Sequence, residues 1–144
     1  MAGYLLVEMK ILSMKKGYVA NIETITSENT DYRRVLYTGE KSQLVVMSLE
    51  PGVEIGEEVH TEIDQFIRVE QGRGVAVLNG ADEHELVAGT AVIIPAGVRH
   101  NVTNTGDTPL KLYSVYSPAE HKDGVVQATK ADDAEEHFDG VTTE

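Results

Sequence analysis

Short apolar segments with alternating side chains are the feature that most constrains the fold of this chain. They are rich in Val, Ile, Leu and Tyr, and turn residues separate them, among them Glu50-Pro51-Gly52, Asn79-Gly80 and Pro95-Ala96-Gly97. Alternation of this kind is typical of β-strands with one buried face. We therefore predict strands over 32–38, 42–49, 65–70, 74–79, 84–87, 91–94 and 110–116.

The order of these segments predicts the fold class. They follow one another without helical stretches between them, which favours antiparallel hairpins in an all-β sandwich or small barrel. A chain of 144 residues has the usual length of one domain, and its 41% of hydrophobic residues suffice for one core. We expect an N-terminal extension over 1–16, a β-barrel domain over 17–118 and an acidic C-terminal tail over 119–144.

The net charge of −12 limits the partners of the protein. It repels phosphate backbones and anionic lipid, so we expect neither nucleic acid nor a membrane as a partner. Eight acidic residues and two lysines lie in 119–144, which predicts a mostly solvated tail. Within the tail we expect a short helix over 129–138, with Thr129 as its cap and Gly140 after its end.

The cysteine count and the N-terminal residues indicate the compartment. The chain has no cysteine, which excludes disulfides, thiolate metal ligands and a thiol nucleophile. The apolar residues near the N-terminus are too few to span a bilayer, and no basic segment precedes them as it would in a secretory signal. We expect a cytoplasmic protein, whose metal, where it binds one, has nitrogen and oxygen ligands.

Two stretches with fixed spacing carry the chemistry. Their residues are, in the first, Gly52, Glu58, His60, Gln65 and Gly72 and, in the second, Gly89, Pro95, Gly97, His100 and Asn104. The stretches resemble the two motifs of the cupin superfamily, G-x5-H-x-H-x3–4-E-x6-G and G-x5-P-x-G-x2-H-x3-N. The second matches at every fixed position. The first has Glu58 where the family has its first His, and Gln65 where the family has Glu.

This resemblance implies a double-stranded β-helix, a jelly-roll-like barrel, with a metal inside it and Glu58, His60, Gln65 and His100 as the ligands. The residue types agree with that expectation. Residues two apart on a strand point to one face about 6.6 Å apart, so Glu58 and His60 are close enough to share an ion. Two nitrogen and two oxygen donors with one negative charge favour Mn²⁺, Fe²⁺, Co²⁺ or Zn²⁺ over Cu²⁺ and Ni²⁺.

Several of these residues have a purely structural alternative. Glu58 lies in an acid-rich stretch, and it is a ligand, a general base or a solvated acid. Gln65 is a ligand or a hydrogen-bond partner of one. We expect Asn104 to fix a loop through hydrogen bonds. Three further histidines have no matching partner in the motifs, and we expect them to be exposed: His84, His121 and His137.

The function that follows is a metal-dependent enzyme in which the ion acts as a Lewis acid on a small polar molecule and Glu58 is a catalytic residue. Resemblance to mannose-6-phosphate-isomerase-like proteins implies sugar or sugar-phosphate isomerisation. Two alternatives stay open, an O₂-using dioxygenase with a two-His-one-carboxylate face and a non-catalytic binder of metal or metabolite.

Two further expectations concern a phosphate and a partner chain. The basic residues available to bind a phosphate are Arg33, Arg34, Lys41, Arg68, Arg73 and Arg99, but alternation places Arg68 and Arg99 on the face opposite Gln65 and His100. The family resemblance and the free edge strands also lead us to expect a homodimer.

Overall fold

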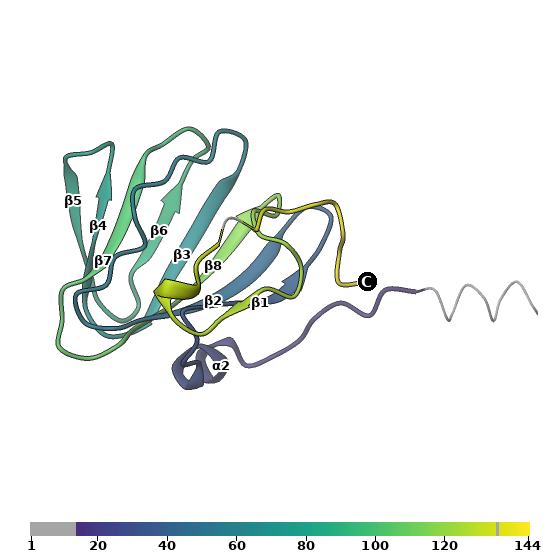
Figure 1. Ribbon diagram of the computed structural model, residues 1–144, viewed down its shortest axis with the longest axis horizontal. Coiled ribbons are helices and arrows are strands. Elements are labelled where there is room, and N and C mark those ends of the chain that lie inside the picture. Colours follow the sequence, from purple (N-terminus) through teal and green to yellow (C-terminus); the bar gives the residue numbers. More distant parts are fainter. Residues whose placement is uncertain (1–13, 135) are drawn as a thin grey trace, which may run out of the picture.

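The structure is a computed structural model and describes residues 14–134 and 136–144. Two antiparallel sheets make up the body of the protein (Figure 1). The larger sheet has the strand order β6-β3-β8-β2-β1-β9 and the smaller one β5-β4-β7. The bounds are β1 Arg33–Thr38, β2 Gln43–Leu49, β3 Asp64–Gln71, β4 Gly74–Leu78, β5 Asp82–Leu86, β6 Ala91–Ile94, β7 His100–Asn104, β8 Leu110–Ser117 and β9 Val126–Gln127. All seven predicted strands are present, with ends that agree to within two residues, and the predicted all-β double-stranded β-helix is confirmed.

The inward-facing side chains change from apolar to polar along the barrel. Leu112 of β8 pairs with Met47 of β2, and both are fully buried in the apolar core. Two inward positions further along β8, Tyr116 lies between Gln43 of β2 and Gln65 of β3, and these three are also buried. One end of the barrel interior is therefore a hydrophobic core, and the other end collects polar groups that need partners.

Three elements were not predicted from the alternation. Helix α2 (Ile22–Glu28) begins at Asn21, whose side chain accepts a hydrogen bond from the Thr24 amide at 3.0 Å, and it packs against the larger sheet. Strand β7 alternates correctly, but two of its three buried residues are His100 and Asn104, so a hydrophobic pattern does not mark it. Strand β9 has only two residues.

Most described residues of the tail over 119–144 are exposed, as expected for a mostly solvated segment, but part of the tail packs on the barrel. Strand β9 pairs with β1, with Gln127 opposite Arg33. Ala119, Val125 and Gln127 are buried. In Figure 1 the yellow-green segment that follows β8 passes beside β1 and β2 and returns across the barrel.

The helix expected over 129–138 is a single 3-10 turn, η1 (Lys130–Asp132), capped by Thr129. Polar contacts to the barrel account for its shortness. Lys130 Nζ donates to the carbonyl oxygens of Glu54 and Ile55, and Asp133, at the end of the turn, accepts from Arg33 at 2.7 Å. Asp133, which makes the contact with Arg33, already has extended backbone, so the helix ends there.

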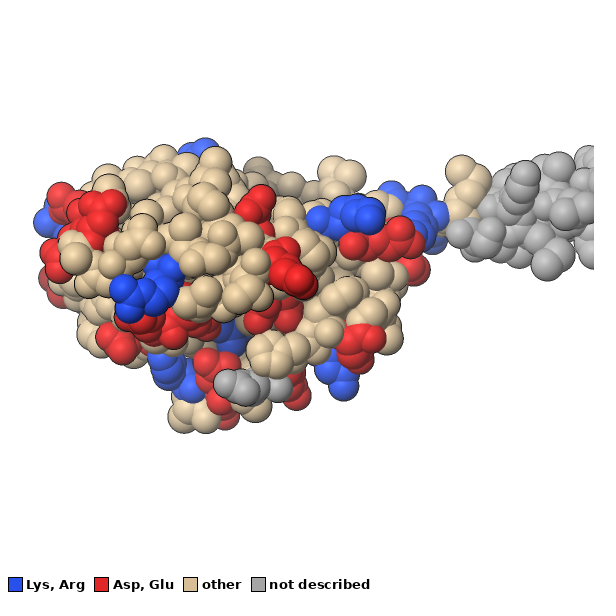
Figure 2. All heavy atoms as spheres, turned by 90° about the horizontal axis from the view of Figure 1, so that it is seen from above, with Lys and Arg blue, Asp and Glu red and all other residues tan. Residues whose placement is uncertain are grey.

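Charged groups are mixed over the surface in view in Figure 2. On that face blue Lys and Arg side chains lie among red acidic ones, and they do not gather into a broad basic area among the residues described. Among the residues that the structure describes, the helices are too short or too polar to cross a lipid bilayer.

Candidate metal centre

The chain segment 52–60 brings the first motif alongside β7. Gly52 donates to the Asn104 carbonyl at 3.0 Å, and further along Glu58 and His100 exchange both backbone hydrogen bonds, at 2.9 and 3.0 Å. Direct antiparallel partners point their side chains to the same face. His60 follows two residues later, where its carbonyl accepts from the Gly97 amide at 2.8 Å. The two motifs are thus joined through their backbones.

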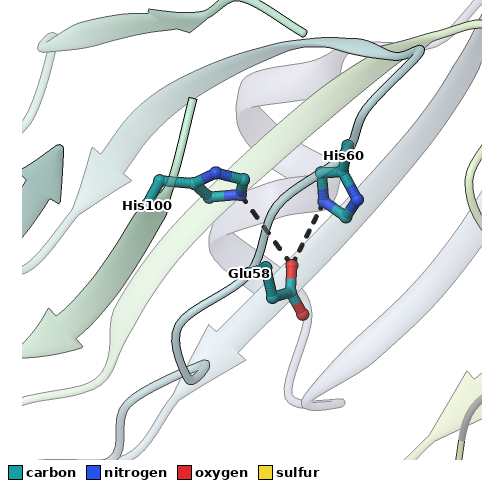
Figure 3. Close-up of side chains that lie close together, drawn as sticks. All are labelled: Glu58, His60 and His100. Atoms are coloured by element: carbon teal, nitrogen blue, oxygen red, sulfur yellow. Dashed lines mark ion pairs between the residues drawn. The ribbon is translucent and has the colours of Figure 1, made fainter. Parts of the chain in front are cut away.

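Three side chains converge at this point, as Figure 3 shows for Glu58, His60 and His100. Glu58 Oε2 lies 3.2 Å from His60 Nε2 and 3.9 Å from His100 Nε2. One ligand atom from each residue lies within 4.8 Å of the others, and the two imidazole ring centres are 5.1 Å apart. His60 and His100 are nearly buried, whereas 30% of the Glu58 side chain is exposed. The structure therefore brings together three of the four predicted ligands in a group that can hold a metal ion.

The second nitrogen of each imidazole faces an oxygen outside the three-residue cluster. His100 Nδ1 faces the Val98 carbonyl at 3.0 Å, so it carries the proton and donates it. His60 lies between two carboxylates, with Nδ1 3.4 Å from Glu120 Oε2 and Nε2 3.2 Å from Glu58 Oε2, and an ion bound at Nε2 would leave its proton on Nδ1. Both Nε2 atoms are buried, and neither has a well-oriented hydrogen-bond partner. Two imidazole Nε2 atoms beside one carboxylate are a donor set that suits a divalent transition metal.

The electrostatics of the centre favour an ionised carboxylate beside a neutral His100. Burial by itself would raise the pKa of Glu58, but the contact with His60 and the nearby charges of His60, Arg33 and His100 hold it below the ordinary value. Burial lowers the pKa of His100. Burial by itself would lower the pKa of His60, but the contact with Glu58 and the charges of Glu120 and Glu58 raise it above the ordinary value, so a metal ion competes with a proton at this ring. At neutral pH the site therefore offers one negative charge and an unprotonated His100 Nε2.

Gln65, the fourth predicted ligand, lies on β3 with 3% of its surface exposed. Its Nε2 donates to Ser114 Oγ and Tyr116 Oη, both at 3.3 Å. Its Oε1 is buried and has no hydrogen-bond partner. The amide oxygen is thus free to serve as a fourth metal donor. Its coordination to a metal stays a prediction.

A pocket of 460 Å³ opens next to the centre, lined in part by Glu58 and His60. Its other walls include residues that the motifs did not indicate, among them Glu120 and His121 in the segment after β8. Gln43 of β2 places these two, because its Oε1 accepts from both of their amides, at 3.3 and 3.0 Å. A polar residue at an inward position of a predicted strand, such as Gln43, was the sequence signal that could have pointed to these neighbours.

His121 is not exposed, contrary to the sequence-based expectation. Its ring packs edge-on against Tyr116 with ring centres 5.0 Å apart, and its Nε2 is buried without a partner. Burial, and after it the nearby positive charge of Arg33, lowers the pKa of His121 to about 3. His84 and His137 are exposed as expected. Asn104 also behaves as expected, because its buried amide group bonds to Leu49 O and Thr108 O and accepts from the Gly106 amide.

An all-β barrel that gathers two histidines and one carboxylate inside one end defines the class of double-stranded β-helix proteins with an internal His/Glu centre. The family model for the cupin domain matches residues 45–116. The chain belongs to the cupin family.

Two of the similar proteins are named as uncharacterized. It is 45% identical to the uncharacterized protein YrkC of Bacillus subtilis over 122 residues, which are 81% of this chain and 66% of YrkC. It is 40% identical to the uncharacterized protein L612 of Acanthamoeba polyphaga mimivirus over 123 residues, 83% of this chain and 77% of that protein. A Bacillus halodurans protein of known crystal structure shares 44% identity and superposes with a TM-score of 0.80, covering 83% of this chain and 95% of its own.

Proposed function

We propose that the protein holds one divalent transition metal through Glu58, His60 and His100, with Gln65 Oε1 as a fourth donor, and binds a small polar molecule beside it. The observation that carries this proposal is the pair of buried Nε2 atoms without oriented partners next to one carboxylate. When bound, such a metal supplies a Lewis acid that polarises a carbonyl or hydroxyl oxygen. The donor set favours Mn²⁺, Fe²⁺, Co²⁺ or Zn²⁺.

The surrounding residues have separate tasks in this proposal. Glu120 orients the His60 ring, and the Val98 carbonyl orients His100. The 460 Å³ pocket is large enough for a small metabolite. Sugar-phosphate isomerisation has weak support, because Arg33 is the one Lys or Arg among the described residues that line the pocket, and five acids line it as well.

Metal analysis of protein purified without a nickel affinity step tests the proposal. Wild type should carry up to one divalent metal and bind Mn²⁺ in calorimetric titrations, and His60→Ala and His100→Ala should both lose it. His84→Ala is the matched control, since His84 is an exposed histidine on β5 and should bind metal as wild type does. Full binding in either site variant would refute the assignment.

A non-haem iron dioxygenase is the second candidate, and one observation favours it. The three clustered residues are two histidines and one carboxylate, the donor set of Fe²⁺ proteins that use O₂. Protein loaded with Fe²⁺ or with Zn²⁺ and offered a metabolite panel separates the candidates. Substrate-dependent O₂ consumption only with Fe²⁺ supports the dioxygenase, turnover with both metals supports the Lewis acid, and binding without turnover supports a non-catalytic binder.

A further inference from the structure

Arg33 is a buried cation in the pocket next to the candidate metal centre. It lies at the start of β1, its side chain is 3% exposed, and it lines the same pocket as Glu58 and His60. A buried guanidinium needs acceptors for its N–H groups, because an unpaired charge inside a protein is strongly unfavourable. How its donors are satisfied therefore shows what the pocket is built to receive.

The hydrogen bonds of this guanidinium to described residues are both made by one nitrogen. Nη1 donates to Gln127 Oε1 and to Asp133 Oδ1, each at 2.7 Å. Nε is buried and has no acceptor. The hydroxyl of the neighbouring Tyr32 is also buried, and it lies close to this guanidinium without a well-oriented hydrogen bond to it. The edge formed by Nε and Nη2 is the edge with which arginine binds a carboxylate through two parallel hydrogen bonds.

The charge balance of the pocket limits how much negative charge a bound anion can carry. The acids of its lining are Glu57, Glu58, Glu120, Asp133 and Glu136. Glu57 pairs with Arg99 at the rim, and Glu120 contacts two histidines, His60 and His137. Asp133 already partners Arg33. A single carboxylate matches the one available guanidinium edge, whereas a phosphate dianion would add a second negative charge among these acids.

We propose that the Nε–Nη2 edge of Arg33 binds the carboxylate of a small monocarboxylic acid, whose oxygen-bearing end then reaches the Glu58–His60–His100 centre. This inference rests on the proposed function, which it deepens by naming the substrate class. Arg33 is the specificity-determining residue, and Asp133 balances its charge. The carboxylate oxygens accept from Nε and Nη2, and no covalent step is involved.

Calorimetric titration of a series of ω-hydroxy acids, from glycolate to 5-hydroxypentanoate, into Mn²⁺-loaded protein tests the inference. The matching neutral amides are the chemical controls. At least one acid should bind, and its amide should bind at least tenfold more weakly. Asp133→Asn should tighten binding of the acid about threefold, because it removes a competing negative charge next to Arg33. Arg33→Gln should weaken it at least tenfold.

Three results would overturn the inference. They are equal binding of an acid and its amide, weaker acid binding by Asp133→Asn, and no binding of any acid by wild type. Should Arg33→Gln not fold, the acid–amide pairs and Asp133→Asn decide the question alone. Titration of Mn²⁺ into each variant keeps the two proposals apart. Normal Mn²⁺ binding without acid binding refutes the carboxylate site only, and absent Mn²⁺ binding in wild type refutes the metal centre.

Discussion

Glu58 is the residue whose environment decides what the centre can bind. Its carboxylate lies between two imidazoles, and its backbone is fixed to His100 by two hydrogen bonds. Its pKa stays below the ordinary value despite burial, so it is an anion at neutral pH. These contacts argue against a simply solvated acid, and the roles of metal ligand and general base stay predictions.

Replacing Glu58 by Gln separates those two roles. Glu58→Gln keeps the size and reach of the side chain but leaves only neutral donors, so Mn²⁺ affinity should fall roughly a hundredfold, as expected for a charge lost near an ion at an effective dielectric constant of about 20. Glu57→Gln is the matched control, because Glu57 pairs with exposed Arg99 instead. Calorimetry on both variants is the measurement. Unchanged Mn²⁺ affinity with lost turnover would make Glu58 a general base.

The swap Glu58→His with Gln65→Glu completes the test. It recreates the usual cupin ligand set and again brings one negative charge, so it should restore Mn²⁺ binding if both positions face the ion. Failure of the double variant to bind, while it stays folded, would count against Gln65 as a ligand position.

Motif spacing predicted the residues of the centre, and it could not predict the residues around it. Glu58, His60 and His100 follow from two local patterns whose geometry is set by strands and tight turns. Arg33 reaches the centre because β1 pairs with β2, and His121 reaches it because the segment after β8 folds back on the barrel. Contacts between distant segments of this kind leave no periodic signal in the sequence.

Among the elements, the segment that follows β8 has the clearest role at the site. Gln43 holds its backbone at Glu120 and His121, and Lys130 ties η1 to the carbonyls of Glu54 and Ile55. Its acidic composition correctly predicted that most of its residues are exposed, but charge counts do not reveal which side chains find partners on the barrel. The strands were predictable for the opposite reason, since alternation on β2, β3 and β8 directly reports a buried face.

Burial of a neutral His121 by this segment should make stability depend on pH. In the unfolded chain His121 gains a proton near its ordinary pKa of about 6.5, whereas in the folded protein it does so only near about 3. The unfolded state therefore binds more protons between these values, and stability should fall as pH falls from about 6.5, by up to about 1.4 kcal/mol per pH unit. His121→Gln should show a shallower fall.

Urea unfolding at pH 6.5, 5.5 and 4.5 in the presence of EDTA measures this slope without a contribution from bound metal. His84→Gln is the control, because His84 is exposed on β5 and should keep the wild-type slope. Equal slopes for wild type and His121→Gln would show that the ring is solvated at the lower pH.

At the scale of the whole molecule, the two ends of the described chain meet beside β1. Thr143 exchanges hydrogen bonds with Thr38, and the Glu144 carboxylate accepts from the amides of Lys16 and Gly17 at 2.6 and 2.9 Å. Tyr37 Oη donates to the same carboxylate at 2.9 Å. Residues separated by most of the sequence thus share one anchor, which no local pattern could predict.

The expected homodimer and the expected cytoplasmic location stay predictions.

Glu144 should hold this junction only while it is ionised. The amide hydrogen bonds from Lys16 and Gly17, and then the Tyr37 hydroxyl, lower its pKa, so its contribution is present above the ordinary value of about 4.3 and lost as pH falls through the folded-state value. Glu144→Gln has only one accepting oxygen for three donors. Amide exchange at Lys16 and Gly17, measured by NMR at pH 7, should therefore be roughly three- to tenfold faster in the variant. Asp107→Asn removes the same charge from a distant loop and should leave both amides protected.

In wild type, the Gly17 amide shift should titrate with a midpoint below about 4.3. A midpoint at or above that value would mean that the carboxylate spends its time in solvent and the junction is held by Thr38 and Thr143 alone.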